Sequence, residues 1–342
     1  MAELTLEDIA KQVGVSRSTV SRVVNGSPNV SPEVRQQVEE AIRITGFHPN
    51  AAARSLASQR TRVIGLVLPR SVSSFFTDPF FPQLTQGIAV GCNANDLSLS
   101  LFLVTNKEDE DKIMPRISRS GMLDGILVQS GRADDPLMER LINSRIPCVV
   151  LGRPFNHTAF TYVDVDNIKA AYTATKHLID LKYTRIATIT GSHGSTVTLD
   201  RIEGYVNALQ EAGYEIDSSL IAKGEFSETS GYEAMKSLLP HKPDAVFIAS
   251  DLMASGAIRA LQDAGLRVPE DIALVGFDDI PLAALTNIRL TTVRQPIPQI
   301  GTKGVELLIE LIEKGSQPPR NFILDTELII RDSCGTKLRQ KV

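Results

Sequence analysis

The 342-residue sequence has no tryptophan, three cysteines and few aromatic residues. Cys92, Cys148 and Cys334 are odd in number and far apart, which suits neither a disulfide framework nor a metal site, so we expect reduced thiols. No apolar run approaches the roughly 18 residues that a membrane helix needs. The N-terminal MAELTLEDIAKQ lacks the apolar stretch of a secretion signal, so we expect a cytoplasmic protein without a membrane partner.

An excess of basic residues is also missing. The formal net charge is −4. Residues 1–60 carry seven Lys/Arg and six Asp/Glu, a balance of +1, and the other 29 basic and 34 acidic residues give −5. A DNA-binding hypothesis therefore depends on where the charges lie, not on their sum. At about 100–200 residues per domain, the length predicts two or three domains.

Residues 5–46 contain three short helical patterns. Apolar residues recur at helical spacing after Thr5, Ser16 and Ser31, which are residue types that commonly cap helix N-termini. Pro32 fits the first turn of the third helix, and Gly14 follows the first helix. Two short helices joined at a glycine-containing turn, with a third helix packed against them, describe a helix-turn-helix.

The outward face of the second helix is polar. It carries Arg17, Ser18, Ser21, Arg22 and Asn25. Guanidinium, hydroxyl and amide groups suit phosphate oxygens and the acceptor edge of guanine. A small helical bundle used for protein contacts would present the same groups, so the pattern alone leaves both functions open.

A resemblance favours DNA. The segment TLEDIAKQVGVSRSTVSRVVNG (5–26), followed by VSPEVRQQVEEAI and GFHPNAAARSLAS, resembles the DNA-binding module of the lactose-repressor (LacI/GalR) family. The resemblance implies that Arg17, Ser18 and Arg22 read bases in the major groove. The positions that it assigns to phosphate contacts are Thr5, Ser16, Thr19, Ser21, Asn25 and Ser31.

The same resemblance gives the next segment a role. After Pro49, Asn50 can cap AAARSLAS, a helix of about eight residues that is marginally stable alone in water. In the family this hinge folds on the operator, and a leucine from each of two chains enters the minor groove. Leu56 matches that leucine, and Ala53 and Arg54 match its neighbours. A plain interdomain linker is the alternative.

Beyond residue 60, short apolar runs alternate with helical patterns. We expect strands at 63–69, 97–104, 125–129, 148–152, 185–191, 245–250 and 273–277, and helices at 82–95, 107–120, 136–144, 167–181, 199–213, 228–239 and 251–264. This alternation predicts parallel, doubly wound sheets. The segment is too long for one such sheet, so we expect two α/β lobes with a ligand cleft at the carboxyl ends of the strands.

Signatures of an enzyme are missing from this sequence. No GxGxxG follows an expected strand, no GxxxxGK[ST] occurs, and the five histidines lack metal-ligand spacing. Asp164 and Asp166 could be a pair of metal ligands, but the interpretation that we favour is a cap for the helix that starts at Asn167. We therefore expect no catalytic residue, no metal and no cofactor.

Residues 61–335 resemble the effector-binding and dimerisation core of the same family, which shares its fold with periplasmic sugar receptors. The resemblance implies three crossings of the chain between two lobes. Lobe one is expected at about 61–161 and 293–322, and lobe two at about 162–292 and 323–335. The DNA-binding domain then covers 1–48, the hinge 49–60, and a tail 336–342.

The resemblance also implies an effector site. Arg201 aligns with an arginine that grips ligand hydroxyls or carboxylates, Asp278 with an aspartate that accepts from vicinal hydroxyls, and Phe226 with an aromatic that stacks on a sugar. Arg201 and Asp278 could also pair with each other, and Phe80 and Phe226 could be ordinary core aromatics. The remaining expected lining residues are Phe80, Gln129, Arg153, Ser250 and Gln295.

Two departures limit the transfer of ligand identity. Arg153 stands where the lactose repressor has an acid, and Ser250 where it has an asparagine, so galactoside recognition is not carried over. The set fits a polyhydroxylated ligand, a sugar or oligosaccharide. A purine or a sugar phosphate is the alternative.

These features predict a sequence-specific transcriptional regulator, a repressor, that binds a pseudo-palindromic operator as a homodimer. The C-terminal TKLRQKV has no apolar heptad repeat, so a four-chain assembly is not expected. Ligand would close the lobes and change whether the hinge helices fold, with inducer and corepressor both open. The rival class is a cytoplasmic sugar-binding receptor or sugar enzyme that retains a helical N-terminal module.

Overall fold

The computed structural model describes residues 4–24, 27–47, 60–69, 71–118, 122–129, 136–155, 158–281, 283, 288–315 and 317–339. The chain divides into two compact units. The N-terminal unit comprises residues 1–63 and 119–124, and the second unit comprises residues 64–118 and 125–342.

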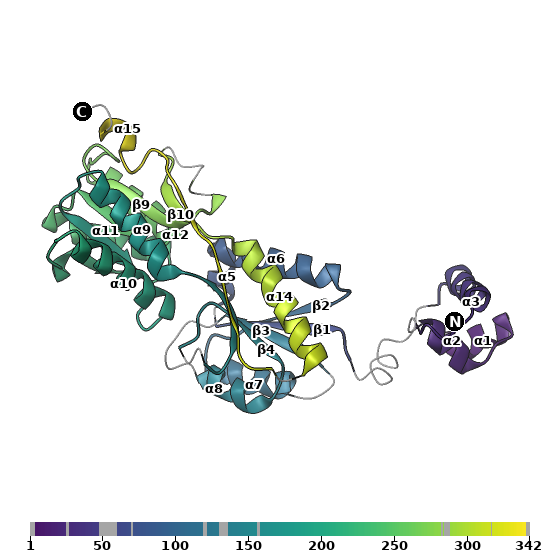
Figure 1. Ribbon diagram of the computed structural model, residues 1–342. Coiled ribbons are helices and arrows are strands. Elements are labelled where there is room, and N and C mark those ends of the chain that lie inside the picture. The colour runs from purple at the N-terminus through teal and green to yellow at the C-terminus, as the bar shows by residue number, and fades with distance from the viewer. Residues whose placement is uncertain are drawn as a thin grey trace. The chain divides into compact units, whose positions relative to one another are not determined.

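The N-terminal unit contains three helices, α1 (Leu6–Val13), α2 (Arg17–Val24) and α3 (Pro32–Thr45) (Figure 1). Thr5 begins α1 with a capping box, in which its hydroxyl accepts from the backbone N–H of Asp8 and its own N–H donates to the Asp8 carboxylate at 2.9 Å. Gly14 ends α1 at φ 75°, a left-handed conformation that glycine adopts without strain. The expected three-helix module is therefore confirmed.

A small apolar core holds these helices together. Ile9 of α1, Val20 of α2 and Val38 of α3 are completely buried, and Phe47 after α3 packs against the same cluster. Each helix thus contributes one apolar face, and the opposite faces stay in water. Arg17, Ser18 and Arg22 of α2 are exposed and take no part in this core.

The first lobe of the second unit is built on a six-stranded sheet with the order β11-β5-β4-β3-β1-β2. Its strands are β1 (Val63–Leu68), β2 (Ser98–Leu103), β3 (Gly125–Gln129), β4 (Cys148–Leu151), β5 (Thr161–Val165) and β11 (Asn321–Leu324). Its helices are α5 (Val72–Thr77), α6 (Phe80–Ala94), α7 (Lys107–Ser118), α8 (Pro136–Ser144) and α14 (Ile297–Lys314). The pairing β1–β3–β4–β5–β11 is parallel throughout.

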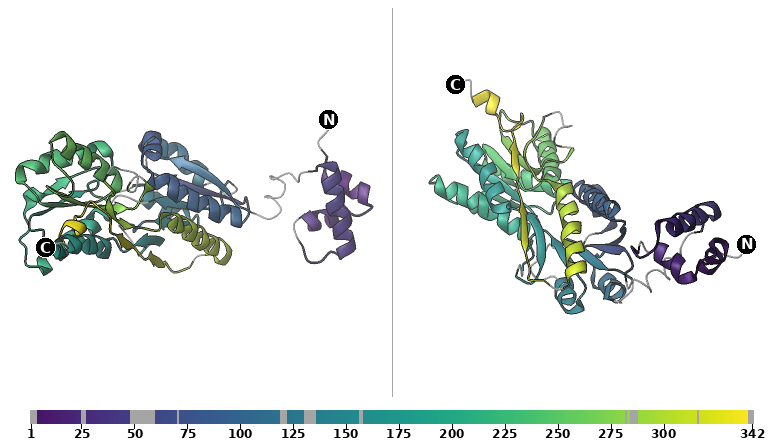
Figure 2. Two further views of the ribbon diagram at one scale, coloured as in Figure 1. Left: turned by 90° about the horizontal axis from the view of Figure 1, so that it is seen from above. Right: turned by 45° about the vertical axis from the view of Figure 1, so that its right-hand side comes forward.

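Helices α6 and α14 lie side by side although about 200 residues separate them in the chain (Figures 1 and 2). Glycines allow this close approach. A Cβ atom at Gly87 would lie 1.9 Å from the backbone oxygen of Pro298, and one at Gly301 would lie 2.6 Å from the backbone oxygen of Leu84. Alanine at either position would force the two helices apart.

The second lobe contains a six-stranded sheet with the order β12-β10-β9-β8-β6-β7. Its strands are β6 (Ile186–Thr190), β7 (Ile221–Lys223), β8 (Ala245–Ile248), β9 (Ala273–Asp278), β10 (Thr291–Arg294) and β12 (Glu327–Ile329). Its helices are α9 (Asn167–Asp180), α10 (Thr196–Glu211), α11 (Glu228–Leu238), α12 (Asp251–Asp263) and the short α15 (Thr336–Arg339). Strand β12 is antiparallel to β10, whereas the pairs β10–β9, β9–β8, β8–β6 and β6–β7 are parallel.

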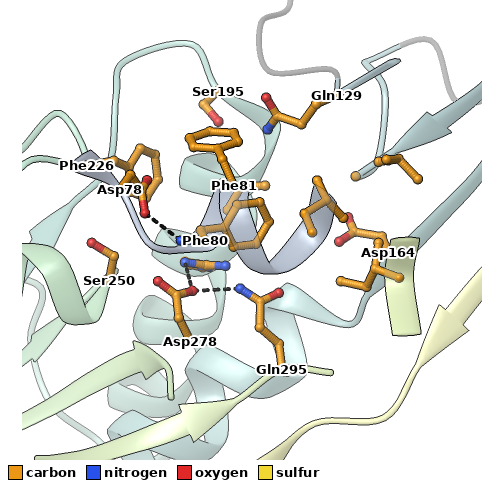
Figure 3. A pocket seen from close by; sticks show the side chains of 16 residues that line it. Asp78, Phe80, Phe81, Gln129, Asp164, Ser195, Phe226, Ser250, Asp278 and Gln295 are labelled. Atoms are coloured by element: carbon orange, nitrogen blue, oxygen red, sulfur yellow. Dashed lines mark hydrogen bonds and ion pairs between the residues drawn. The ribbon is translucent and has the colours of Figure 1, made fainter. Parts of the chain in front are cut away.

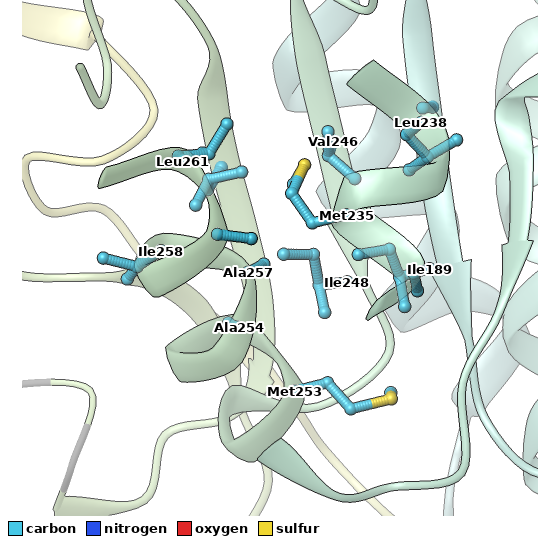
Figure 4. Packing of buried hydrophobic residues seen from close by; sticks show 14 of the residues in the cluster. Ile189, Met235, Leu238, Val246, Ile248, Met253, Ala254, Ala257, Ile258 and Leu261 are labelled. Carbon is cyan, nitrogen blue, oxygen red and sulfur yellow. The ribbon is translucent and has the colours of Figure 1, made fainter. Parts of the chain in front are cut away.

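One core of this lobe lies between the sheet and helices α11 and α12. Figure 4 shows Ile189 and Ile248 of the sheet facing Met235 of α11 and Ala257 of α12. All four side chains are completely buried. The near-continuous apolar strands of the sequence thus reflect burial on both faces of a parallel sheet.

The chain crosses between the lobes three times, after β5, after β10 and after β11, and its C-terminal part runs from lobe one to lobe two (Figures 1 and 2). The structure places these crossings, expected at about 161/162, 292/293 and 322/323, a few residues later in the chain. Sheet pairing is the reason. Val163 pairs with Leu151 in lobe one, Val293 pairs with Phe277 in lobe two, and Ile323 pairs with Asp164 in lobe one.

Within the described residues, no helix combines the length and the apolar character that crossing a membrane requires. Cys92, Cys148 and Cys334 are free thiols.

Candidate functional site

Two surfaces carry the residues singled out by the sequence, and the first is the outward face of α2. Arg17, Ser18 and Arg22 are exposed, while Val20 and Val23 on the opposite face are buried. The first turn of α2 contains no acidic residue. The positive end of the helix and its two arginines therefore meet no carboxylate on the same helix, which favours an anionic partner.

Hydroxyl groups cluster at the start of α2. Ser16 Oγ lies 2.7 Å from Ser18 Oγ and 2.8 Å from Thr19 Oγ1, and it accepts a hydrogen bond from the Thr19 N–H at 3.1 Å. Three hydroxyls with rotatable hydrogens can redirect their donors toward a phosphate oxygen. Ser21, the other expected phosphate contact of α2, is half-buried.

The other expected phosphate contacts stand at helix N-termini. Thr5 caps α1 and its hydroxyl donates to Asp8 at 2.7 Å. Ser31 caps α3 by accepting from the Val34 N–H at 3.4 Å. Both side chains are exposed. Asn25, Ala53, Arg54 and Leu56 lie outside the described residues, so their roles in DNA binding remain predictions.

The second surface is a cavity in the second unit, lined by both lobes (Figure 3). Its residues stand at the carboxyl ends of parallel strands, where a ligand cleft was expected. Gln129 ends β3 and Asp164 lies near the end of β5 in lobe one, while Asp278 ends β9 and Gln295 follows β10 in lobe two.

Seven expected residues line this cavity, namely Phe80, Gln129, Arg201, Phe226, Ser250, Asp278 and Gln295. Lining residues that the sequence did not single out for a ligand are Asp78, Phe81, Leu84, Leu151, Gly152, Asp164, Ser195, Val197 and Ile300. For Asp164 and Asp166 the sequence favours a helix cap over a metal pair. Asp166 caps α9 by accepting from the Lys169 N–H at 2.9 Å, whereas Asp164 is buried in the cavity wall.

A chain of polar contacts connects the two lobes across the cavity floor. Asp164 accepts from the side-chain amide of Asn167 at 3.2 Å, and Asn167 accepts from Arg201 Nε at 3.0 Å. Arg201 Nη1 lies 3.8 Å from Asp278 Oδ1, and this oxygen accepts from Gln295 Nε2 at 2.6 Å (Figure 3). Arg201 and Asp278 thus pair with each other, as considered from the sequence.

Arg201 is held on every side. It is 5% exposed, donates to the backbone oxygen of Ala249, and stacks over the ring of Phe277 with its guanidinium carbon 3.5 Å from the ring centre. Burial lowers the pKa of this guanidinium. The stack fixes its plane, so its remaining donors have a defined direction.

Burial shifts the carboxyl groups of the site in the opposite direction. It raises the pKa of Asp278 to about 7, although Arg201 opposes the shift, and raises the pKa of Asp164 to about 6. Asp251, behind the cavity, has a pKa raised well above its usual value by burial and by Asp278. The site therefore concentrates acidic groups around one buried guanidinium.

The backbone is strained at two cavity residues. Phe226 has φ 54° and Asp278 has φ 116°, values that non-glycine residues rarely adopt. Gly191 leaves room for the Phe226 ring, since a Cβ atom there would lie 1.9 Å from Phe226 Cζ. The aromatic ring is thus placed in the cavity wall at a conformational cost.

Gln129 has unused hydrogen-bonding capacity. Its side-chain oxygen is buried and makes no hydrogen bond to the described part of the protein. Figure 3 shows the side chain at the cavity. Because buried polar atoms are usually paired, this oxygen fits a ligand that donates a hydrogen bond, such as a hydroxyl.

Arg153 is the exception among the expected effector residues, because it does not appear among the residues lining the cavity. Its guanidinium binds both carboxylate oxygens of Asp200. The sequence does not reveal that α10 places a carboxylate opposite this arginine, and a role of Arg153 in effector binding remains a prediction. Among the described residues, no group of three or more His, Cys, Asp or Glu side chains is arranged to hold a metal ion.

Comparisons with known proteins cover both units. Residues 5–50 match the family of bacterial regulatory proteins, lacI family, and residues 175–334 match the periplasmic binding protein-like domain. The HTH-type transcriptional regulator CelR of Thermobifida fusca is 38% identical, over 96% of this chain and 98% of that protein.

Solved structures of similar proteins match nearly the whole chain as well. A CelR–cellobiose complex has a TM-score of 0.77 and 36% identity, and the match covers 96% of this chain and 99% of that one. The Lac repressor dimer bound to operator and the anti-inducer ONPF has a TM-score of 0.83 and 25% identity, with 97% and 99% covered.

Proposed function

Because the chain belongs to the LacI family of bacterial transcriptional regulators, we propose that it is a repressor whose operator affinity is controlled by an uncharged saccharide in the interlobe cavity. In this proposal the protein acts as a homodimer on a pseudo-palindromic operator, with half-sites about one helical turn apart. The observation that carries the ligand assignment is the polar chain from Asp164 through Arg201 to Gln295.

The DNA half of the proposal is supported by α2. Arg17 and Arg22 project from a helix whose other face is fixed by the buried Val20 and Val23. An arginine on a fixed helix can place two donors on the O6 and N7 acceptors of guanine. The hydroxyls around Ser16 are suited to the flanking phosphates, which position the helix without selecting sequence.

The charges of the cavity support an uncharged ligand. Three acidic residues line it, Asp78, Asp164 and Asp278, and Arg201 is the one basic residue among the described lining side chains. Because Arg201 already lies 3.8 Å from Asp278, little positive charge is left for a phosphate. A sugar phosphate would therefore be repelled, whereas sugar hydroxyls can donate to the carboxylates and to Gln129.

Aromatic residues add a reason to choose a saccharide. Phe80, Phe81 and Phe226 line the cavity, and flat rings suit the apolar face of a pyranose. The cellobiose bound by the CelR structure, at 36% identity, points to the same ligand class. A purine would use the rings but carries no hydroxyl group that could donate to the carboxylates or to Gln129.

The test is fluorescence anisotropy of the full chain with labelled DNA from upstream of its own gene. We expect tight, sequence-dependent binding that weakens with salt, and a shift of about 5–150-fold when the right neutral saccharide is added. Cellobiose, maltose and ribose are compared with glucose 6-phosphate and guanine. Equal affinity for every DNA sequence, or turnover of a sugar, would favour the receptor or enzyme class instead, and a response to glucose 6-phosphate would overturn the assignment of an uncharged ligand.

A further inference from the structure

Arg153 connects the two lobes directly. It follows β4 in lobe one, and its Nε donates to Asp200 Oδ2 of α10 in lobe two at 2.9 Å, while its Nη2 donates to Asp200 Oδ1. The backbone oxygen of Arg153 accepts from Thr196 Oγ1, also in α10, at 2.7 Å. One residue of lobe one therefore makes side-chain and backbone bonds to one helix of lobe two.

The pair is specific to one arrangement of the lobes. The Asp200 side chain is 8% exposed and that of Arg153 is 31% exposed. Two parallel bonds between a guanidinium and a carboxylate require a fixed mutual orientation. If the lobes separate, both charges regain water but lose each other, so the pair favours the arrangement in which it forms.

The pair also borders the effector cavity without lining it. The Arg153 N–H donates to Asp164 Oδ2 at 2.7 Å, and Asp200 directly precedes Arg201 in α10. Asp164 and Arg201 both line the cavity. Formation of the pair thus brings two ligand-facing residues from opposite lobes into register.

We propose that Arg153 and Asp200 are positioning residues. Their interlobe ion pair stabilises the lobe arrangement of this structure, which we call closed, without the help of an effector or of DNA. The closed arrangement then has a substantial population without effector, and the effector acts on an equilibrium that this pair sets. A charge pair that bridges lobes has this effect, whereas an equally good pair inside one lobe does not.

The chain offers an arginine–aspartate pair inside lobe two for comparison, although it is more exposed, with side chains 57% and 32% accessible. Arg289 binds Asp332 through Nε at 2.7 Å and Nη2 at 3.3 Å, and both residues flank strands of the lobe-two sheet. The variant R289M therefore removes an arginine–aspartate fork without touching the lobe boundary. R153M removes the interlobe pair, and the double variant R153D/D200R restores it with reversed charges.

The experiment measures the distance between the lobes by paired spin labels in the full chain, with no DNA or sugar added. Cysteines introduced at the exposed Arg116 of lobe one and Lys236 of lobe two carry the labels, in a C148A background. We expect R153M to lower the ratio of closed to open molecules by about tenfold, as loss of a charged hydrogen bond predicts. R153D/D200R should recover most of the closed population, and R289M should match the parent protein.

An unchanged distance distribution in R153M would overturn the proposal. So would equal shifts in R153M and R289M, because the effect would then follow from general destabilisation. Thermal unfolding of each variant shows that it is folded. Since neither operator nor effector is present, failure of this proposal is distinguishable from failure of the proposed regulatory function.

Discussion

The N-terminal unit and the interlobe cavity place their functional side chains in opposite environments. The N-terminal unit exposes Arg17 and Arg22 on one short helix, where the pattern of eight consecutive residues decides what they present. The cavity buries Arg201 and Asp278, which lie 77 positions apart in the chain, and burial shifts the pKa of both. A surface that recognises DNA can be changed at little cost in stability, whereas a buried ligand site is also part of the fold.

The substitution R201M tests the role of the buried cavity residues in stability, and we expect it to have the largest effect. It leaves Asp278 and Asp164 buried without the positive charge of Arg201 and removes the bonds to Asn167 and Ala249. We expect the second unit to lose about 3–5 kcal/mol of unfolding free energy. Urea unfolding measures the change. The matched control R259M removes an exposed arginine that is paired with Glu228, and it should cost about 1 kcal/mol or less. Similar losses in both variants would contradict the buried role of Arg201.

A pH titration sharpens the same contrast. Burial raises the pKa of Asp278 to about 7, so the folded protein holds this proton at pH values where the unfolded chain has released it. The contribution of Asp278 to stability is therefore greatest near pH 4 and is lost as pH rises toward 7. We expect the stability advantage of wild type over D278N to fall by about 1–3 kcal/mol between pH 5 and pH 8. A difference that does not change with pH would show that Asp278 stays ionised.

In the N-terminal unit we expect substitutions to weaken function more than stability, the reverse of the cavity. R22A should leave unfolding nearly unchanged but cost about 1–3 kcal/mol of operator binding and relax the choice of base at one position. Anisotropy with single-base operator variants measures both quantities. Arg43, an exposed arginine of α3 that pairs with Glu40, provides the control R43A, which should retain the sequence preference. Loss of preference in R43A as well would argue against specific reading by Arg22.

The smallest expected effect is that of S16A. It removes the acceptor for the Thr19 N–H and the centre of the hydroxyl cluster. We expect α2 to lose about 1 kcal/mol of stability, and all DNA sequences to bind more weakly by a similar factor. Circular dichroism melts and anisotropy at two salt concentrations test this. S73A, at an exposed serine of α5 in the second unit, should change neither measurement.

Local rules predicted most of the long elements of the fold, but not α14 (Ile297–Lys314), an 18-residue helix of lobe one. All three N-terminal helices and the buried strands β1, β3, β8 and β9 correspond to predicted segments. Five short strands were missed, β5, β7, β10, β11 and β12, whose sequences are TYVDV, IAK, TTVR, NFIL and ELI. Such short or polar segments become strands because a neighbouring strand pairs with them, and sequence periodicity does not report that partner.

Only part of the cavity was predicted, because sequence patterns do not report which distant segments come together. Seven of the residues that the resemblance implied for the effector site, including Arg201 and Asp278, line one cavity. The resemblance also implied Arg153, whose partner Asp200 lies 47 positions further along the chain. The sequence favours a helix cap over a metal pair for Asp164 and Asp166, and Asp166 does cap α9, but nothing along the chain indicates that Asp164 lines the cavity.

By itself, the sequence determined the helix starts and stops of the N-terminal unit, the alternation of strand and helix, and the polar face of α2. These features depend on interactions between residues about four positions apart or fewer, so they can be read along the chain. Tertiary structure alone decided which carboxylates meet Arg201, where each crossing falls, and that Arg153 joins the lobes. Those outcomes require distant segments to pack together, and no local pattern encodes the distance between two side chains in space.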